Sequence, residues 1–487
     1  MPLAKLSLYL NICVLLLPVS FAHANVVYNI RLDTSEQLHV QACFDAGEVR
    51  SFKLDSRSYL TSFSGIHLNR EAKKIRGGRI RLGADLAKQS ACLSYRFRLR
   101  HALERQELRN VGRDISRIGS SILSNPGIWL LEPEGAENYV IQFHLPKGIQ
   151  VSAPWLLVDT SYSKYRLSAS ASGWNPQVAF GPFQNTPVIV GDARLDVVYL
   201  KPDNTHASQE VSEDDLMHWI ERVAGHVLQT YGEFPVKRVQ VLLVSVEGDE
   251  GRIGRSKSAV PFARVLRRGG SAVQFFIRPS ADLDEFMDDW TATHEFSHLL
   301  IPYVDRSDGW LSEGVASYYQ NVLRARAGDL SEREAWDKLY KGFERGHRSN
   351  YRDTLSQSIR NNGENRTMRM YWSGAAIALL ADVELRRISN GKQSLDSVLQ
   401  QLAACCLPSN HTWSGRELMQ KLDSLSGYEV FMTQYQRWVH STEFPDTQDL
   451  FQSLGIRTWG GRVSLSDGAE SVELRKSIMQ PLGNYAS

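Results

Sequence analysis

The stretch HEFSH occupies residues 294–298, and the motif WLSEGVASYY places Glu313 fifteen residues past its second histidine. On a helix, His294 and His298 lie on one face about a turn apart, as two imidazoles that bind one metal ion must. Glu295 follows the first histidine, where a general base for a metal-activated water belongs. Catalytic zinc sites usually take three protein ligands and a water. The sequence therefore predicts a zinc hydrolase site with His294, His298 and Glu313 as ligands.

The flanking residues predict that this motif is helical. Ser280 is the expected N-cap, and apolar residues then recur at roughly helical spacing until Pro302 ends the run. A turn cluster follows at residues 305–309, and a second helix then carries Glu313. Two antiparallel helices joined by this short loop would bring Glu313 back over the histidines.

Composition indicates a large globular protein. At 487 residues, with 42% hydrophobic and 10% aromatic residues, the chain has enough length and apolar content for about three domains. Its 56 basic and 54 acidic residues leave a net charge of +2, so nothing indicates a nucleic-acid partner. The sequence leaves the oligomeric state open.

The first residues predict export. Lys5 precedes a largely apolar run at residues 6–17, and residues 22–24 (Ala-His-Ala) offer a small-x-small cleavage site. We expect residues 1–24 to be a secretory signal peptide, with no membrane span after its removal and a periplasmic or secreted protein as the result. Cys13 lies inside the apolar run, which does not fit a lipoprotein anchor.

The remaining cysteines fall into two pairs. In an oxidising compartment, Cys43 and Cys92 could form a disulfide within the N-terminal part of the chain. For the neighbours Cys405 and Cys406 two interpretations stay open, a strained disulfide or two small buried residues at the end of a helix.

The pattern of residues along the chain predicts four segments after residue 24. Each is named here by its range: a β-rich N-terminal domain at 25–203, a catalytic domain at 204–330, a helical subdomain at 331–445 and a short β appendage at 446–487. The expected strands include residues 26–30, 93–97, 139–143, 195–199, 239–246 and 272–277, and a helix is expected to begin at the N-cap Ser212.

These motifs resemble those of known zinc peptidases. HEFSH followed by WLSEGVASYY resembles the gluzincins, whose third metal ligand is a glutamate on the next helix. The stretches beginning at Tyr371 (YWSG) and Ser394 (SLD) resemble the Y-x-K-G helix and the S-L-D-x-V-L segment of the glycyl aminopeptidase family, which is related to the aminopeptidase N family. The resemblance covers roughly residues 210–440. It implies an α+β multidomain fold, with an N-terminal β-rich domain, a thermolysin-like zinc catalytic domain and a mostly α-helical C-terminal subdomain.

The resemblance also implies roles for single residues. His294, His298 and Glu313 would bind zinc, and Glu295 would activate water. Tyr371, at the position of the motif tyrosine, would donate a hydrogen bond to the developing oxyanion. A core aromatic at a helix start is the alternative for Tyr371.

Several features depart from the family pattern. Ser373 replaces the motif lysine, and no G-x-M-E-N-like sequence precedes the zinc helix. Residues 262–271, which stand at the place of that sequence, are basic. If Arg267 and Arg268 face the cleft, they would favour an acidic or carboxylate-bearing substrate. The alternative is that both arginines are solvated loop residues. We expect residues 272–277 to be the edge strand over the cleft. Too few residues follow the helical part for a PDZ-like domain.

Two aspartates of the turn cluster are candidates for a supporting role. Asp305 or Asp308 could orient one of the histidines by a hydrogen bond.

The leading hypothesis is a secreted or periplasmic zinc metallopeptidase of aminopeptidase type, with one Zn2+ per chain and a peptide substrate. An endopeptidase or another amide hydrolase of the same fold is the alternative within this class, because the amine-binding glutamate is absent. A non-catalytic binding protein that retains a zinc site is the alternative outside it.

Overall fold

The computed structural model describes most of the chain. The described residues are 26–83, 90–109, 114–136, 138–159, 163–168, 177–203, 210–246, 257–267, 269–349, 353–358, 364–409 and 411–481. The predicted signal peptide and Arg268 lie outside them. Within these ranges, no helix combines the length and apolarity that a membrane crossing requires.

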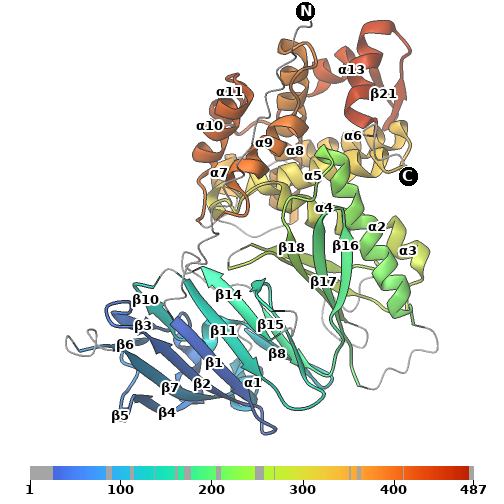
Figure 1. Cartoon of the computed structure of the whole chain (residues 1–487). Coiled ribbons are helices and arrows are strands. Elements are labelled where there is room, and N and C mark those ends of the chain that lie inside the picture. The colour runs from blue at the N-terminus through green and yellow to red at the C-terminus, as the bar shows by residue number, and fades with distance from the viewer. Residues whose placement is uncertain are drawn as a thin grey trace, which may run out of the picture.

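The N-terminal part is built from β-sheets, as predicted, and forms the lower part of Figure 1. Its largest sheet has eight strands in the order β13-β14-β11-β1-β2-β7-β4-β5. Inward and outward side chains alternate along β1 and β2, which is the pattern of strands with one face on a core. The bounds are β1 Val26–Leu32, β2 Gln37–Phe44, β4 Phe63–Leu68, β5 Glu71–Ala72, β7 Ala91–Arg98, β11 Asn138–His144, β13 Leu156–Leu157 and β14 Lys164–Ser168.

Two smaller sheets and a helix complete this part. The three-stranded sheet has the order β10-β3-β6 and the four-stranded sheet the order β12-β15-β9-β8. Their bounds are β3 Ser51–Lys53, β6 Arg79–Arg81, β10 Glu132–Glu134, β8 Ile115–Ile118, β9 Ser121–Ser124, β12 Gln150–Ser152 and β15 Val178–Gly181, and the helix is α1 Leu99–Arg109.

Both cysteine pairs are joined. Cys43 on β2 and Cys92 on β7 are direct cross-strand neighbours, and a disulfide links them. Cys405 and Cys406, at the end of a helix in the C-terminal part, are bonded to each other, so the disulfide is the alternative that the structure adopts.

The central part holds a five-stranded sheet in the order β16-β17-β18-β20-β19. Strands β17 (Ala193–Leu200), β18 (Arg238–Ser245) and β20 (Ala272–Ile277) are parallel, and β16 (Thr186–Val190) and β19 (Phe262–Leu266) flank them as antiparallel edges. The prediction that residues 272–277 form the edge strand is therefore wrong. Every residue of β20 is buried, as expected of a strand with a neighbour on each side and both faces covered.

The predicted boundary at residue 203 lies too far along the chain. Strand β17 pairs in parallel with β18, so it belongs to the central sheet and not to the N-terminal β-rich part. The turn to the central part falls between β15 and β16, at about residues 182–185. Periodicity identified the strand at 195–199 but carries no information about the sheet that it joins.

The helices around the zinc motif differ in two respects from the prediction. Helix α2 (Glu213–Tyr231) begins at Ser212, as predicted, where the serine hydroxyl accepts from the amide of Asp215. The predicted continuous zinc helix is instead two short helices, α3 (Leu283–Asp288) and α4 (Thr291–Ser297), separated at residues 289–290. The N-cap of α3 is Asp282 rather than Ser280, because Asp282 and Glu285 form a capping box.

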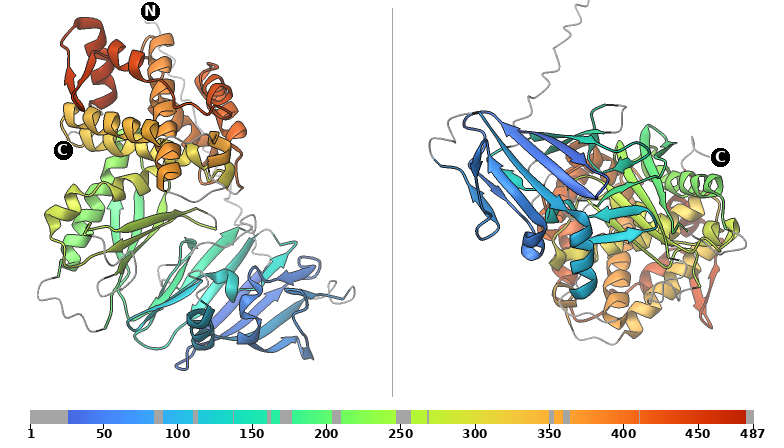
Figure 2. Two further views of the ribbon diagram at one scale, coloured as in Figure 1. Left: turned by 180° about the vertical axis from the view of Figure 1, so that it is seen from behind. Right: turned by 90° about the horizontal axis from the view of Figure 1, so that it is seen from below.

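The rest of the chain is mostly helical and lies above the central sheet in Figure 1 and in the left view of Figure 2. Its elements are α5 Gly309–Arg326, α6 Glu332–Arg348, α7 Leu355–Ser358, α8 Glu364–Ile388, α9 Leu395–Cys406, α10 Gly415–Ser426, α11 Phe431–Trp438, α12 Gln448–Ser453, β21 Ile456–Trp459, β22 Arg462–Leu465 and α13 Ala469–Met479. The C-terminal segment is thus a β-hairpin between two helices, not only a β appendage. The α+β multidomain class is confirmed.

A buried ionic cluster joins three of these helices. Asp396 on α9 accepts from Arg326 of α5 at 3.0 and 2.9 Å and from Arg386 of α8 at 3.0 Å, and the hydroxyl of Tyr319 donates to it at 2.8 Å. Burying these charges is favourable only because each finds a partner. The cluster holds α8, which carries Tyr371, against α5, which carries Glu313.

Candidate metal and active site

The predicted ligand atoms lie together. Oε2 of Glu313 is 3.3 Å from Nε2 of His294 and 3.5 Å from Nε2 of His298. The two histidine side chains come from α4 and the 3₁₀ turn that continues it, and both are only 4% exposed. Glu313 comes from the first turns of α5. The close packing of α4 on α5 therefore places a carboxylate beside two imidazoles, as the spacing of the motif predicts.

Each histidine is oriented through its other ring nitrogen. Nδ1 of His294 lies 2.8 Å from Oε1 of Gln320, and Nδ1 of His298 lies 2.8 Å from the hydroxyl of Ser312. Both partners stand on α5 with Glu313. Such contacts fix the orientation of each ring and direct its Nε2 toward a shared metal ion.

The predicted orienting role of Asp305 or Asp308 is wrong. Asp305 caps the 3₁₀ turn Arg306–Asp308 by accepting from the amide of Ser307, and Asp308 accepts from the amide of Gly415 at 2.8 Å. Both aspartates thus stabilise the loop before α5. The sequence did contain a signal for Gln320, the residue that orients His294, since Gln320 is two helical turns from Glu313 on the same helix face.

Arg267 supports the same cluster from the end of β19. Its Nη1 donates to the carbonyls of His298 at 2.6 Å, Ile301 at 3.0 Å and Pro302 at 3.3 Å, and its Nη2 donates to Ser312 at 2.8 Å. Burial lowers the pKa of the Arg267 guanidinium to about 10. Arg267 is therefore neither a cation that faces the cleft nor a solvated loop residue, and it anchors the backbone that ends the zinc motif.

Glu295 is buried beside the ligand cluster. Its side chain and those of His294 and His298 place ligand atoms within 4.8 Å of one another. The backbone N–H of Val265 on the edge strand β19 hydrogen-bonds its carboxylate. Burial raises the pKa of Glu295 to about 7, which is the range in which a carboxylate can both accept and release a proton at neutral pH.

Tyr371 reaches the same cluster from α8. Its ring stacks against that of His294 with 5.9 Å between centroids, and its phenol hydrogen-bonds the Glu313 carboxylate. Burial raises the pKa of Tyr371 well above its ordinary value, so the phenol keeps its proton and remains a donor. Tyr371 lies inside α8, not at a helix start as the alternative interpretation assumed.

Two glycines let α5 and α8 approach closely enough for this contact. A Cβ on Gly314 would lie 2.3 Å from the backbone of Gly374, and one on Gly374 would lie 2.2 Å from the carbonyl oxygen of Trp310. Gly314 follows Glu313, and Gly374 follows Tyr371 by three residues. The absence of side chains at the crossing brings the carboxylate and the phenol together.

Two of the three candidate ligands have the charge that metal binding requires. Burial lowers the pKa of His298 to about 4, so its ring is neutral at pH 7, whereas for His294 the carboxylates of Glu313 and Glu295 outweigh burial and raise the pKa. Burial alone would raise the pKa of Glu313, but the two histidines outweigh it and lower that pKa well below its ordinary value. A neutral imidazole and an ionised carboxylate are the forms that coordinate metals.

Comparisons with known proteins support the fold. No protein-family model and no curated protein matches the sequence. Among solved structures, an aminopeptidase N family protein from Idiomarina loihiensis superposes with a TM-score of 0.63 at 14% identity, covering 88% of this chain and 78% of that one. A mutant of a two-domain M1 zinc metallopeptidase bound to L-arginine gives a TM-score of 0.51 at 13% identity, covering 86% and 94%.

A third similar structure is leukotriene A4 hydrolase from Saccharomyces cerevisiae. Its TM-score is 0.53 at 11% identity, and the match covers 88% of this chain and 70% of that one. At such low identities these likenesses establish a fold shared with the three structures and leave the chemistry to be argued from the residues of the site.

Proposed function

We propose that this protein is a zinc-dependent peptidase of aminopeptidase type that holds one zinc ion per chain between His294, His298 and Glu313. The distances of 3.3 and 3.5 Å from Glu313 Oε2 to the two histidine Nε2 atoms carry the proposal. Ligand atoms about 2.0–2.1 Å from a tetrahedral zinc ion lie about 3.3–3.4 Å from one another. Two of the three distances between ligand atoms thus fit a tetrahedral zinc ion.

The other residues of the site fit hydrolysis. A zinc ion held here would supply a Lewis acid that polarises the substrate carbonyl and a water molecule. Glu295 would accept the proton of the attacking water and pass it to the leaving amine, for which a pKa of about 7 is suitable. Tyr371 would donate its phenolic proton in a hydrogen bond to the oxyanion that develops on the carbonyl.

The aminopeptidase type is supported by the architecture shared with an aminopeptidase N family protein. One observation favours the endopeptidase alternative. Strand β19 (FARVL, Phe262–Leu266) contains no acidic residue that could bind a free amine, and as an edge strand it can pair with an extended peptide. The test must therefore compare peptides with free and blocked N-termini.

An oxidising compartment is part of the proposal. The predicted signal peptide and the disulfide between Cys43 and Cys92 support a periplasmic or secreted location, because such bonds persist mainly outside the cytosol. Peptides in that compartment would be the substrates.

Elemental analysis and a peptide-library assay test the proposal together. We expect about one zinc per chain and cleavage that a chelator abolishes and added zinc restores. Preference for free over acetylated N-termini would assign the aminopeptidase type, and equal or better cleavage of acetylated peptides would assign the endopeptidase type. A metal-free protein, or a zinc-loaded protein that cleaves no peptide, would contradict the proposal.

A further inference from the structure

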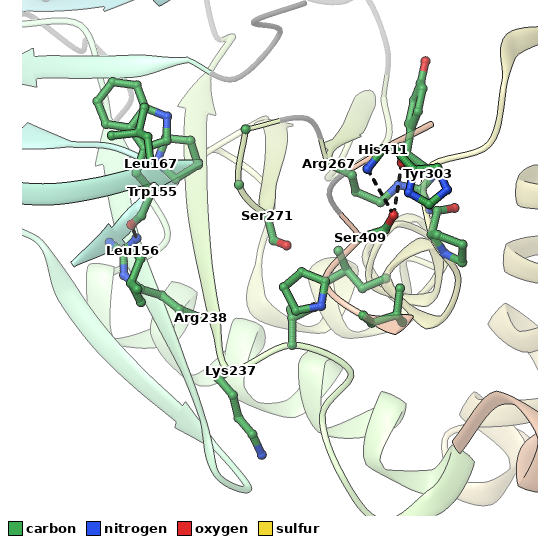
Figure 3. Close-up of a pocket in the computed structure, with 18 of the residues that line it drawn as sticks. Trp155, Leu156, Leu167, Lys237, Arg238, Arg267, Ser271, Tyr303, Ser409 and His411 are labelled. Carbon is green, nitrogen blue, oxygen red and sulfur yellow. Dashed lines mark hydrogen bonds between the residues drawn. The ribbon is translucent and has the colours of Figure 1, made fainter. Parts of the chain in front are cut away.

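A cavity of about 540 Å³ lies where the three parts of the chain meet. Its lining comes from the N-terminal sheet (Trp155, Leu167), the central part (Val236, Ser271) and the loop after α9 (Leu407, His411), as Figure 3 shows for most of these residues. None of His294, Glu295, His298, Glu313 and Tyr371 lines it. The cavity is therefore distinct from the candidate metal site, and its volume is typical of a site for a small molecule.

The walls of the cavity are mainly apolar. Trp155, Leu156, Leu299, Ile301 and Pro408 are among the residues that form them. Leu156 is 58% exposed although it is a large apolar side chain on a strand. Apolar surface that faces an open cavity indicates a ligand with an apolar body, because filling the cavity would remove this surface from water.

The charged groups of the lining are cationic. Arg166, Lys237, Arg238 and Arg267 line the cavity, and none of its lining residues is acidic. Lys237 pairs with Asp192, and Arg238 shares Asp196 with Arg194. Neither Arg166 nor Arg267 forms an ion pair with any residue in the described part of the chain.

Two of these cations have unused donors. Nε of Arg166 and Nε of Arg267 are buried and have no hydrogen-bond partner in the described part of the chain. A buried donor without a partner costs free energy, more so when the group is charged. An anionic group bound in the cavity would offset the positive charge of these side chains.

Close backbone contact holds the walls together. A Cβ on Gly270, whose φ is +135°, would lie 2.3 Å from the carbonyl oxygen of Pro154. Nη1 of Arg238 donates to the carbonyls of Ala153, at 3.2 Å, and Trp155. The N-terminal and central parts are thus joined on one side of the cavity by direct contacts, and the cavity is a built feature of the interface.

From the apolar walls, the cationic lining and Arg166, which has no ion-pair partner in the described part of the chain, we propose that this cavity binds a small amphipathic carboxylic acid. The apolar body lies between Trp155 and the Leu299–Pro302 segment, and the carboxylate accepts a hydrogen bond from Arg166. The proposal does not rest on the proposed peptidase activity.

Calorimetric titration with ligands that differ only in their head group tests this. We expect decanoate to bind the purified protein at one site per chain, and 1-decanol to bind at least about tenfold more weakly, because it lacks the charge that pairs with arginine. Equal affinity for the acid and the alcohol would overturn the proposal, as would the absence of saturable decanoate binding.

A pair of matched variants places the site. Leu156 is the direct cross-strand neighbour of Arg166, so Leu156→Glu puts a carboxylate beside that arginine and should weaken decanoate binding at least about tenfold. Ile189→Glu is the control, since Ile189 is equally exposed, at 57%, and does not line the cavity. Both variants change an exposed side chain, so folding should be kept. Equal decanoate affinity in the two variants would exclude the cavity as the binding site.

Discussion

The side chain of Arg267 holds the backbone of His298, because its Nη1 donates a hydrogen bond to the His298 carbonyl oxygen at 2.6 Å. The same guanidinium donates through Nη2 to Ser312, whose hydroxyl contacts Nδ1 of the His298 ring. One arginine at the end of the edge strand therefore positions both the backbone and the side chain of a candidate metal ligand.

Arg267→Lys should weaken zinc binding. Lysine keeps the charge but cannot bond two or more acceptors in the planar fork geometry of a guanidinium. We expect a loss in zinc affinity of about 10- to 100-fold, the range found when groups that orient metal ligands are removed. Competition with a chromogenic chelator measures it. Arg278→Lys is the control, because the partners of Arg278 (Lys257, Ser258, Ser280 and Glu285) include no residue of the site. Equal zinc affinity in the two variants would contradict the role of Arg267.

Ser312→Ala should act in the same direction. It removes the hydroxyl that contacts Nδ1 of His298, and it also removes an acceptor of Arg267. Zinc affinity should fall by about 10- to 100-fold. Ser317→Ala, another buried serine on the same helix that contacts neither histidine, should leave the affinity unchanged.

Glu295→Gln should separate metal binding from turnover. The amide cannot accept a proton from water, so peptide hydrolysis should fall by about 10²–10⁴-fold, while the zinc content measured by elemental analysis stays the same. Activity close to that of the wild type would remove Glu295 from the mechanism.

Tyr371→Phe should lower kcat by about 10²–10³-fold, the usual effect of deleting one oxyanion donor. Because the phenylalanine ring can still stack on His294, we expect unchanged zinc content and little change in thermal stability. A change confined to KM would assign Tyr371 to substrate binding instead.

Asp396→Asn should destabilise the helical part strongly. Two buried arginines would lose their shared carboxylate, at a cost of about 3–5 kcal/mol in the free energy of unfolding. Asp192→Asn, which breaks the exposed pair with Lys237, should leave the free energy of unfolding nearly unchanged. Denaturant titration with helix content as the readout compares them.

The same carboxylate predicts a pH dependence of stability. Burial opposes its ionisation, but Arg326 and Arg386 prevail and lower the pKa of Asp396 below its ordinary value. The stabilisation is therefore fully present above the unfolded-state pKa of about 3.9 and is lost as pH falls through the lower folded-state value. Asp396→Asn should show a smaller decrease in melting temperature over that acidic range than the wild type.

The sequence by itself determined the local features. The four-residue spacing of His294 and His298, the cap at Ser212 and the strand patterns depend on contacts between residues close together in the chain, so periodicity reveals them. Glu313 could be predicted from the sequence for a related reason. A short loop between two helices brings the second helix back over the first.

Only the tertiary structure decided which distant segments meet. Strand β17 joins the central sheet, β19 rather than β20 forms its edge, and Arg267 supports His298 instead of facing substrate. Each of these depends on packing between residues far apart in sequence, and the same local pattern is compatible with several partners. The spacing of a motif can therefore name the residues of a site, but the surroundings that orient and charge those residues are set by long-range contacts.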